Sequence, residues 1–316
     1  MKAIRILFII FILILTLLGC NSNNMTQIGF SVYDMKFDFF KEMEKGTRTH
    51  LRELGYTLVV DDQKSSTENQ ISGCRELLQK GVKVLIVSPI DVTAMREIVE
   101  EAHGYHVPVI INDIGGGGSD YDAFVLSDGI EGGRMAGEYL HTVLLEQNRD
   151  KHARVLVFRN NPQVAVAHSR GDGFLEIANE YGWEIVRDAV VEGEKETAYM
   201  MMKNLLKETT DIDAVFCTND PMALGVAQAC EEENIEGVNI IGFNGDIDAL
   251  KAIRAGRMLA TVQQYPYAMG EIAADLADML YKNVDIDFDI PEEKAILVPV
   301  LLIDSDNVED AFKALH

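Results

Sequence analysis

VPVIIND at residues 107–113 and VNIIGFN at residues 238–244 share one pattern. Each is a short apolar run that ends in a polar residue, Asp113 in the first segment and Asn244 in the second. The two polar residues are 244 − 113 = 131 positions apart. Because short apolar runs bounded by turn residues are typical of buried β-strands, the pair indicates a duplicated strand.

Other segments repeat in the same order along the chain. Gly46 and Gly55 lie nine residues apart, and Gly55 opens the run GYTLVVDD; Gly173 and Gly182 have the same spacing, and Gly182 opens GWEIVRDA. A further matched pair is VKVLIVSP at residues 82–89 and IDAVFCTN at residues 212–219. Self-similarity of this length is typical of repeated structural units.

The repeat predicts an α/β fold with two similar doubly wound lobes. Short apolar runs alternate with longer helical patterns, which indicates parallel strands joined by crossover helices. The chain has 316 residues, and two lobes of about 100 to 150 residues each are the ordinary division of that length. We expect strands near 27–33, 56–61, 83–88 and 107–112 in the first lobe, and near 154–159, 184–190, 213–218 and 238–243 in the second.

The N-terminal segment predicts export. Two basic residues precede the uncharged run ILFIIFILILTLL at residues 6–18, which is too short for an ordinary membrane-spanning helix. The run ends in LLGC, which resembles the lipobox of bacterial lipoproteins, so we expect a signal peptide over 1–19, lipid on Cys20 and a tether over 20–27. More than one acyl chain gives stable anchoring. The alternative is an uncleaved anchor; either way the body lies outside the cytoplasm.

Charge and cysteine content exclude several classes of function. The formal net charge of −23 repels phosphate backbones and anionic lipid, so we expect no nucleic-acid binding. Cys74, Cys217 and Cys230 form no CxxC motif and no Cys/His metal set, and buried thiols are their expected state. We expect no cofactor and no metal.

Parallel sheets bind ligands beyond the carboxyl ends of their strands. The positions selected by this rule are Tyr33 to Phe40, Ser88, Asp113 and Ile114 in the first lobe, and Asn160 to His168, Asn219 and Asn244 in the second. A carboxylate flanked by amides suits vicinal hydroxyl groups, because the carboxylate accepts hydrogen bonds and amides both donate and accept them. Phe37, Phe39 and Phe40 are suited to cover the apolar face of a sugar ring.

Four motifs then carry a family resemblance. They are DGIEGGRMAGEYL at 128–140, AVFCTNDPMALGVAQA at 214–229, IIGFNGD at 240–246 and ATVQQYPYAMG at 260–270. In this order they resemble the periplasmic sugar-binding proteins of the ribose and galactose type, the substrate-binding subunits of ABC importers. The resemblance covers about residues 27 to 300.

The resemblance implies the type I periplasmic binding protein fold, in which two doubly wound lobes joined by three crossover strands close around a monosaccharide. It implies crossings near Ser127, Gln263 and Asp289. The expected N-terminal lobe is 28–127 plus 264–288, and the expected C-terminal lobe is 128–263 plus 289–316.

The resemblance also implies individual binding residues. They are the acidic Asp113, the amide Asn219, Asn244 at a position where Asp is usual, the hinge amide Gln264, and the stacking pair Phe39 and Phe40. Ile114 and His168 stand where ribose binders place arginine, and Gly193 stands where a third aromatic is common. Since arginine supplies a fork of charged donors, these departures disfavour ribose itself.

Several neutral ligands remain open: another pentose, a hexose, inositol or a deoxysugar. Tyr33, Asn160, Asn161 and His168 are candidate contacts for such a ligand. The lack of a basic residue at the two departing positions argues against a phosphorylated or carboxylated ligand.

Structural roles compete for some of these residues. Phe39 and Phe40 begin an amphipathic helix, so one of them has a core role as its alternative. Asp113 could instead form a turn, and His168 could instead lie on the surface. In Asn219-Asp220-Pro221 we expect Asp220 at the N-cap and Pro221 at the first helical position, which leaves Asn219 for the ligand.

We expect a monomeric binding protein and not an enzyme, since the sequence has no GxSxG, HExxH or CxxC motif. A glycosidase needs two carboxylates at one site, and Asp113 alone qualifies. Two hypotheses remain, delivery of a monosaccharide to an ABC permease or docking on a membrane histidine kinase or chemoreceptor, with a hydrolase ranked below both. A neighbouring permease gene would favour transport, and a neighbouring kinase gene would favour sensing.

Overall fold

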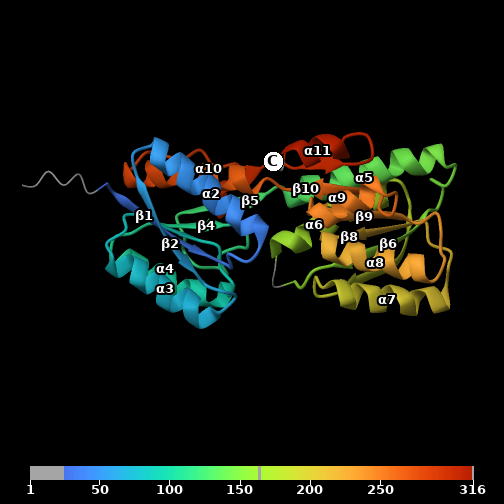
Figure 1. The fold of residues 1–316 in the computed structure, drawn as a ribbon, viewed down its shortest axis with the longest axis horizontal. Helices are drawn as coiled ribbons and strands as arrows, with labels where there is room; N and C mark the ends of the chain where they lie inside the picture. The colour runs from blue at the N-terminus through green and yellow to red at the C-terminus, as the bar shows by residue number, and fades with distance from the viewer. Residues whose placement is uncertain (1–24, 163–164, 315–316) are drawn as a thin grey trace, which may run out of the picture.

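The computed structural model describes residues 25–162 and 165–314, which form two α/β lobes side by side (Figure 1). The first lobe has a six-stranded sheet in the order β11-β5-β4-β3-β1-β2, with every neighbouring pair parallel. Its strands are β1 (Gln27–Val32), β2 (Thr57–Asp62), β3 (Leu85–Val87), β4 (Val109–Asn112), β5 (Ala123–Ser127) and β11 (Ala295–Val298).

The second lobe repeats this plan in the order β12-β10-β9-β8-β6-β7. Its strands are parallel except for β12, which pairs antiparallel with β10. They are β6 (Arg154–Arg159), β7 (Glu184–Val190), β8 (Ala214–Cys217), β9 (Asn239–Asn244), β10 (Ala260–Gln263) and β12 (Leu301–Ile303). The two-lobed, doubly wound α/β fold expected from the repeat is confirmed.

Helices cover both faces of each sheet. In the first lobe they are α2 (Asp38–Glu53), α3 (Thr67–Gln79), η1 (Val92–Ala94), α4 (Met95–Gly104), α10 (Pro266–Tyr281) and η2 (Pro291–Glu293). In the second they are α5 (Gly129–Glu146), α6 (Ala165–Glu180), α7 (Lys195–Glu208), α8 (Asp220–Glu232), α9 (Ile247–Arg254) and α11 (Val308–Ala314). One core cluster joins the first sheet to α2 and α10, and another joins it to α3 and α4. The second sheet packs on α5 and α6 on one side and on α7, α8, α9 and α11 on the other.

The central strands are buried on both faces. Every residue of β3, β4 and β8 is buried, as expected for strands of a parallel sheet sandwiched between helices. This explains why these strands appear in the sequence as continuous apolar runs and not as alternating ones.

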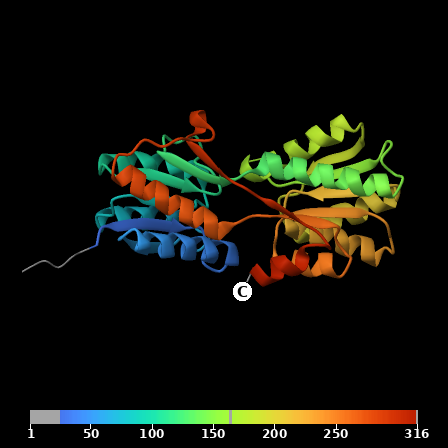
Figure 2. The same ribbon diagram turned by 90° about the horizontal axis from the view of Figure 1, so that it is seen from above.

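Three segments cross between the lobes, and Figure 2 shows the last of them as a red segment running from one lobe to the other. The first crossing lies between β5 and α5, and the second between β10 and α10. The third was expected near Asp289, and that position is wrong. Residues 295–298 still belong to the first lobe, because β11 pairs in parallel with β5, and the crossing falls at Pro299 and Val300.

Close helix packing fixes α6 against α5. A Cβ added at Gly133 of α5 would lie 2.0 Å from the carbonyl oxygen of Arg170 on α6. Only glycine permits this approach, which seats Arg170 firmly in the second lobe.

The expected signal peptide over 1–19 and the lipidated Cys20 lie outside the described residues. In residues 25–162 and 165–314 no helix combines the length and the apolar character needed to cross a bilayer.

Candidate ligand-binding site

The two strand-end residues that revealed the repeat both have a positive φ angle. Asp113 follows β4 with φ 81° and Asn244 ends β9 with φ 133°, and both values lie in the positive region that most residues avoid. Asn and Asp tolerate such angles better than other non-glycine residues, and strain of this kind gathers at functional sites. Both strand ends therefore have a positive φ, and this shared feature supports a functional role for each.

Asp113 carries its charge in a partly buried position. Its backbone N–H donates to the carbonyl of Val125 at 2.8 Å, which continues the sheet beyond β4. Among the residues that the structure describes, none donates a hydrogen bond to its carboxylate. Burial raises the pKa of Asp113 to about 6, against the lowering effect of the Arg170 guanidinium in the opposite lobe. The carboxylate thus lies within electrostatic reach of the second lobe, and no donor of the described residues occupies its acceptor positions.

Arg170 is a site residue that the sequence reasoning missed. It lies on α6, two positions after His168, and is only 6% exposed. Its guanidinium stacks 4.0 Å above the ring of Phe243 and donates to the side-chain oxygen of Asn244 at 3.0 Å. Burial lowers the pKa of Arg170 to about 10, so it stays charged at neutral pH. The signal for Arg170 was an arginine within the small-residue stretch SRGDG, on a helix that follows a strand end.

Gln264 connects the two lobes at the second crossing. Its side-chain oxygen accepts from Arg170 at 3.1 Å, and its amino group donates to the hydroxyl of Ser127 at 2.9 Å. Ser127 ends β5 in the first lobe, whereas Arg170 belongs to the second. Since Gln264 is 4% exposed, this chain of bonds ties both lobes to the hinge without contact with bulk water.

The four aromatic candidates form one cluster at the end of β1. Tyr33 stacks on Phe40 with ring centroids 4.9 Å apart, and Phe39 meets Phe40 edge to face at 5.2 Å. Phe40 is 7% exposed and belongs to the core, Phe39 is partly buried, and Phe37 is 44% exposed. Phe37 and Tyr33 therefore provide the accessible ring surface of the cluster, and the buried ring of Phe40 packs against both.

The start of α8 differs from the expectation. Asn219, and not Asp220, is the N-cap: its side-chain oxygen accepts from the N–H of Met222 at 2.9 Å. Its amino group donates to the carbonyl of Gly193 at 2.9 Å. Asp220 is fully buried and accepts from the backbone N–H groups of Gly245 and Asp246. The carboxylate of Asp220 thus connects the start of α8 to the loop after β9 and does not cap the helix. The side-chain oxygen and amino group of Asn219 are both hydrogen-bonded to the protein.

The remaining candidates lie in different surroundings. Ser88 is fully buried and its hydroxyl lies 3.4 Å from the sulfur of Met43, inside the first lobe. Ile114 is partly buried against the core cluster that contains Phe40. His168 is partly buried on α6, and its Nδ1 has no hydrogen-bond partner within the described part of the chain.

Polar groups of the β6–α6 connection complete the second lobe's strand ends. The side-chain oxygen of Asn160 accepts from the N–H of Asn161 at 2.8 Å. Gly193 has φ 79°, and a Cβ there would lie 2.8 Å from this same oxygen. A larger side chain at position 193 would therefore collide with the amide of Asn160. Residues 163–164, within the expected site segment, lie outside the described residues.

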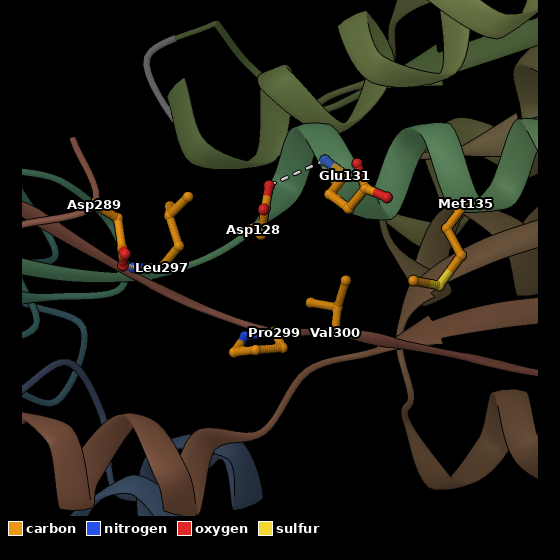
Figure 3. A pocket seen from close by; sticks show the side chains of 7 residues that line it. All are labelled: Asp128, Glu131, Met135, Asp289, Leu297, Pro299 and Val300. Atoms are coloured by element: carbon orange, nitrogen blue, oxygen red, sulfur yellow. Dashed lines mark hydrogen bonds between the residues drawn. The ribbon is translucent and has the colours of Figure 1, made fainter.

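A separate pocket of about 380 Å³ lies at the hinge. Figure 3 shows its lining: Asp128, Glu131, Met135, Asp289, Leu297, Pro299 and Val300. The carboxylate of Asp128 caps α5 through the N–H of Glu131, and that of Asp289 accepts from the N–H of Leu297. Both carboxylates thus accept from nearby backbone N–H groups, and none of the strand-end candidates lines this pocket.

The described residues include three cysteines and several possible metal ligands. Cys74, Cys217 and Cys230 are free and buried, and burial raises the pKa of all three thiols. In the described ranges no group of three or more His, Cys, Asp or Glu side chains is arranged for a metal ion.

A family model described as a periplasmic binding protein domain matches residues 28–283. The chain belongs to the periplasmic binding protein family. Within this family, the ribose import binding protein of Bacillus subtilis (strain 168) is 32% identical over 260 residues, which cover 82% of this chain and 83% of that protein.

Two solved structures are similar along most of their length. A periplasmic ribose ABC transporter structure from Conexibacter woesei DSM 14684 has 25% identity and a TM-score of 0.83, covering 92% of this chain and 95% of that one. The Caulobacter myo-inositol binding protein, bound to myo-inositol, has 26% identity and a TM-score of 0.76, covering 91% and 96%. The expected type I periplasmic binding protein fold is confirmed by these matches.

Proposed function

We propose that this protein captures a neutral monosaccharide or related polyol between its lobes and delivers it to an ABC permease. The observation that carries the proposal is the carboxylate of Asp113, which interacts electrostatically with Arg170 of the other lobe and receives no hydrogen bond from the described residues. Because this carboxylate is partly buried and takes no donor from the described residues, its acceptor positions are open to a ligand. Vicinal hydroxyl groups supply two donors at the required spacing. The ribose and myo-inositol relatives support a ligand of this class.

The charges around the site favour a neutral ligand. Arg170 is a buried cation, and it already donates to the carbonyl of Thr218 and to the side-chain oxygens of Asn244 and Gln264. Both terminal nitrogens of Arg170 therefore donate to protein oxygens, while its Nε has no partner among the described residues. The nearby carboxylates of Asp113, Asp220 and Asp246 act electrostatically on Arg170 and would repel an anion.

Capture proceeds by hinge closure, in which a ligand that contacts both lobes shifts the population toward the closed form. Phe37 and Tyr33 cover an apolar face of the ring, while Asp113 and Asn244 take its hydroxyl groups. Binding is the whole activity that we propose, without catalysis, and the protein acts as a monomer.

The protein is anchored on the extracytoplasmic face of the membrane through lipid on Cys20. The lipobox-like LLGC segment supports this part of the proposal. The change Cys20→Ser should abolish the incorporation of labelled palmitate and release the protein from the membrane fraction. Retention of both label and membrane association in that variant would contradict lipidation at Cys20.

The function is tested by thermal denaturation against neutral pentoses, hexoses, polyols and deoxysugars. A ligand at 100 times its dissociation constant adds about 2.7 kcal/mol to the free energy of unfolding. We expect a clear rise in melting temperature with at least one neutral compound and none with sugar phosphates. A rise only with anionic compounds, or with none of the panel, would refute the proposal.

A further inference from the structure

The first lobe has an exposed apolar surface at the end where its strands begin. Among its described residues six large apolar side chains are exposed, and one of them, Phe37, follows β1 at the carboxyl end of that strand. The other five lie where a strand begins or where α10 ends, and we call them the basal patch: Met25, Leu54, Tyr105, Tyr281 and Val284. Single exposed apolar residues are common on proteins, whereas a group at one end of a lobe indicates a contact surface.

Backbone and ring contacts bring parts of the basal patch together. The first N–H of β2 donates to the carbonyl of Thr26, next to Met25, at 3.0 Å. Tyr56, in the turn before β2, contacts Tyr281 edge to face with ring centroids 5.9 Å apart. Figures 1 and 2 both show the start of β1 and the end of α10 at the end of the first lobe that lies away from the second lobe. The patch therefore combines segments that are far apart in the sequence.

The chain enters the first lobe at this same end. Between Cys20, which we propose to carry lipid, and Met25 there are 25 − 20 = 5 peptide steps. An extended chain covers at most about 3.6 Å per residue, so Met25 lies within about 18 Å of Cys20. The proposed anchor therefore holds the basal patch close to the membrane, whatever path the tether takes.

We propose that the basal patch rests on the lipid surface to which the chain is anchored. The two tyrosines suit the boundary of a bilayer, because each has an apolar ring and a polar hydroxyl group. Exposed charges beside the patch have both signs, as Arg52, Lys83 and Glu53 show, and the whole chain is acidic. The partner is therefore an electrically neutral, zwitterionic lipid surface, and the contact is apolar. This inference rests on the proposed anchor and adds which face of the protein meets the membrane.

The anchor makes a small patch sufficient. A free protein binds lipid surfaces through extensive apolar burial or through many basic residues, and the basal patch provides neither. A short tether makes the contact intramolecular, at an effective concentration of about the millimolar range. We therefore expect the patch to contact lipid in the anchored chain and not in the free Cys20→Ser protein.

This orientation keeps the candidate ligand site away from the lipid. All strands of the first sheet are parallel, so their carboxyl ends, with Asp113, lie opposite the basal patch. The first lobe then rests on the membrane, and the second lobe is the one that moves relative to the membrane when the hinge closes.

The first test uses the full chain anchored in phosphatidylcholine vesicles. Val284→Cys in the basal patch and Met200→Cys, exposed on α7 of the second lobe, are each labelled with a polarity-sensitive fluorophore. Cys74, Cys217 and Cys230 are buried, and a wild-type sample measures any background labelling. We expect the emission of labelled V284C to shift to shorter wavelength and to lose intensity when the lipid headgroups carry a spin-label quencher. Labelled M200C should show neither change. The same response at both positions would overturn the inference.

A second test removes the patch and leaves the anchor in place. The fluorophore is attached to Tyr105→Cys, and quenching is compared with and without the pair Leu54→Ser and Val284→Ser. We expect this pair to abolish the quenching. The control pair Leu145→Ser and Met200→Ser changes similarly exposed residues of the second lobe and should leave it unchanged. Equal quenching with both pairs would show that the tether alone places this end near lipid, which would refute the contact.

The anchor and the basal contact can fail separately in these experiments. A palmitate-labelled, membrane-bound protein in which V284C and M200C respond alike refutes the contact and leaves the anchor intact. A protein that carries no palmitate and stays in the soluble fraction refutes the anchor, and the contact with it. Neither outcome depends on whether a sugar binds.

Discussion

Asp113 and Arg170 lie on different lobes, and each acts on the other's charge. The Arg170 guanidinium lowers the pKa of Asp113, although burial raises it to about 6, and Asp113 in turn raises the pKa of Arg170 against the lowering effect of burial. Because these two charged groups belong to different lobes, a change in pH that protonates Asp113 alters the interaction between the lobes. The same change alters the group that would accept hydrogen bonds from a ligand.

The first prediction concerns stability without ligand. Because the pKa of Asp113 rises from 3.8 to about 6 on folding, the folded protein holds a proton that the unfolded chain has lost between these pH values. Stability therefore falls as the pH rises through this window, and Asp113→Asn should remove the loss. We expect D113N to be more stable than wild type by on the order of 2 kcal/mol at pH 7, and the difference to shrink toward pH 4. Urea denaturation at several pH values measures this; a pH-independent difference would contradict it.

The same titration should affect ligand affinity. The ionised carboxylate accepts hydroxyl hydrogen bonds, and the protonated form is a poorer acceptor. Affinity should therefore weaken as the pH falls below about 6, by up to about tenfold per unit. Calorimetry between pH 5 and 8 in wild type and D113N provides the measurement and its control. Equal pH dependence in both proteins would assign the effect to another group.

Gln264 should be important for stability as well as for binding. Gln264→Ala leaves the buried donor of Arg170 and the hydroxyl of Ser127 without their partner, which costs about 1 to 3 kcal/mol. The control Gln228→Ala removes an exposed bond to Glu232 and should change stability by less than about 0.5 kcal/mol. Chemical denaturation compares the two. Similar, small losses in both variants would show that the hinge network contributes little.

Substitutions at Phe40 and Phe37 should distinguish a role in core packing from a role in ligand contact. Phe40→Ala removes a core ring that is 7% exposed and should cost about 3 to 5 kcal/mol. Phe37→Ala removes a ring that is 44% exposed and should leave stability within about 1 kcal/mol while weakening sugar binding. Denaturation and calorimetry on both variants check this. Full sugar affinity in F37A would exclude Phe37 from the site.

Close packing between α5 and α6 predicts a strong effect at Gly133. The change Gly133→Ala places a Cβ 2.0 Å from the carbonyl of Arg170, so we expect a loss of at least about 2 kcal/mol together with weaker ligand binding. At Gly104, the last residue of α4, no atom lies within 4 Å of an added Cβ, and Gly104→Ala should be neutral or slightly stabilising. A G133A protein as stable as G104A would show that the helices can separate without cost.

The duplicated strands could be predicted because strands that are buried on both faces have continuous apolar sequences, such as VPVIIND and VNIIGFN. The position of the third crossing could not be predicted from the sequence. The short runs AILV and LLI, at 295–298 and 301–303, are equally apolar, and only their pairing with β5 and β10 shows which lobe each joins. Pro299, between them, ends the first run because it has no N–H to donate.

The site was predictable where it follows strand ends and not where it depends on side-chain partners. Asp113 and Asn244 came from the rule that ligands bind beyond parallel strands. Arg170 lies within a helix, and its role depends on contacts with residues 74 and 94 positions away. The N-cap of α8 could not be predicted for a similar reason. Asp220 accepts hydrogen bonds from Gly245 and Asp246, which are distant in the sequence.

The most direct test is calorimetric titration of wild type and D113N, at pH 7, with the neutral sugar or polyol that most raises the melting temperature. The expected result is one bound molecule per wild-type chain, with affinity lowered at least about a hundredfold in folded D113N. Binding of equal affinity in both proteins would contradict capture through Asp113.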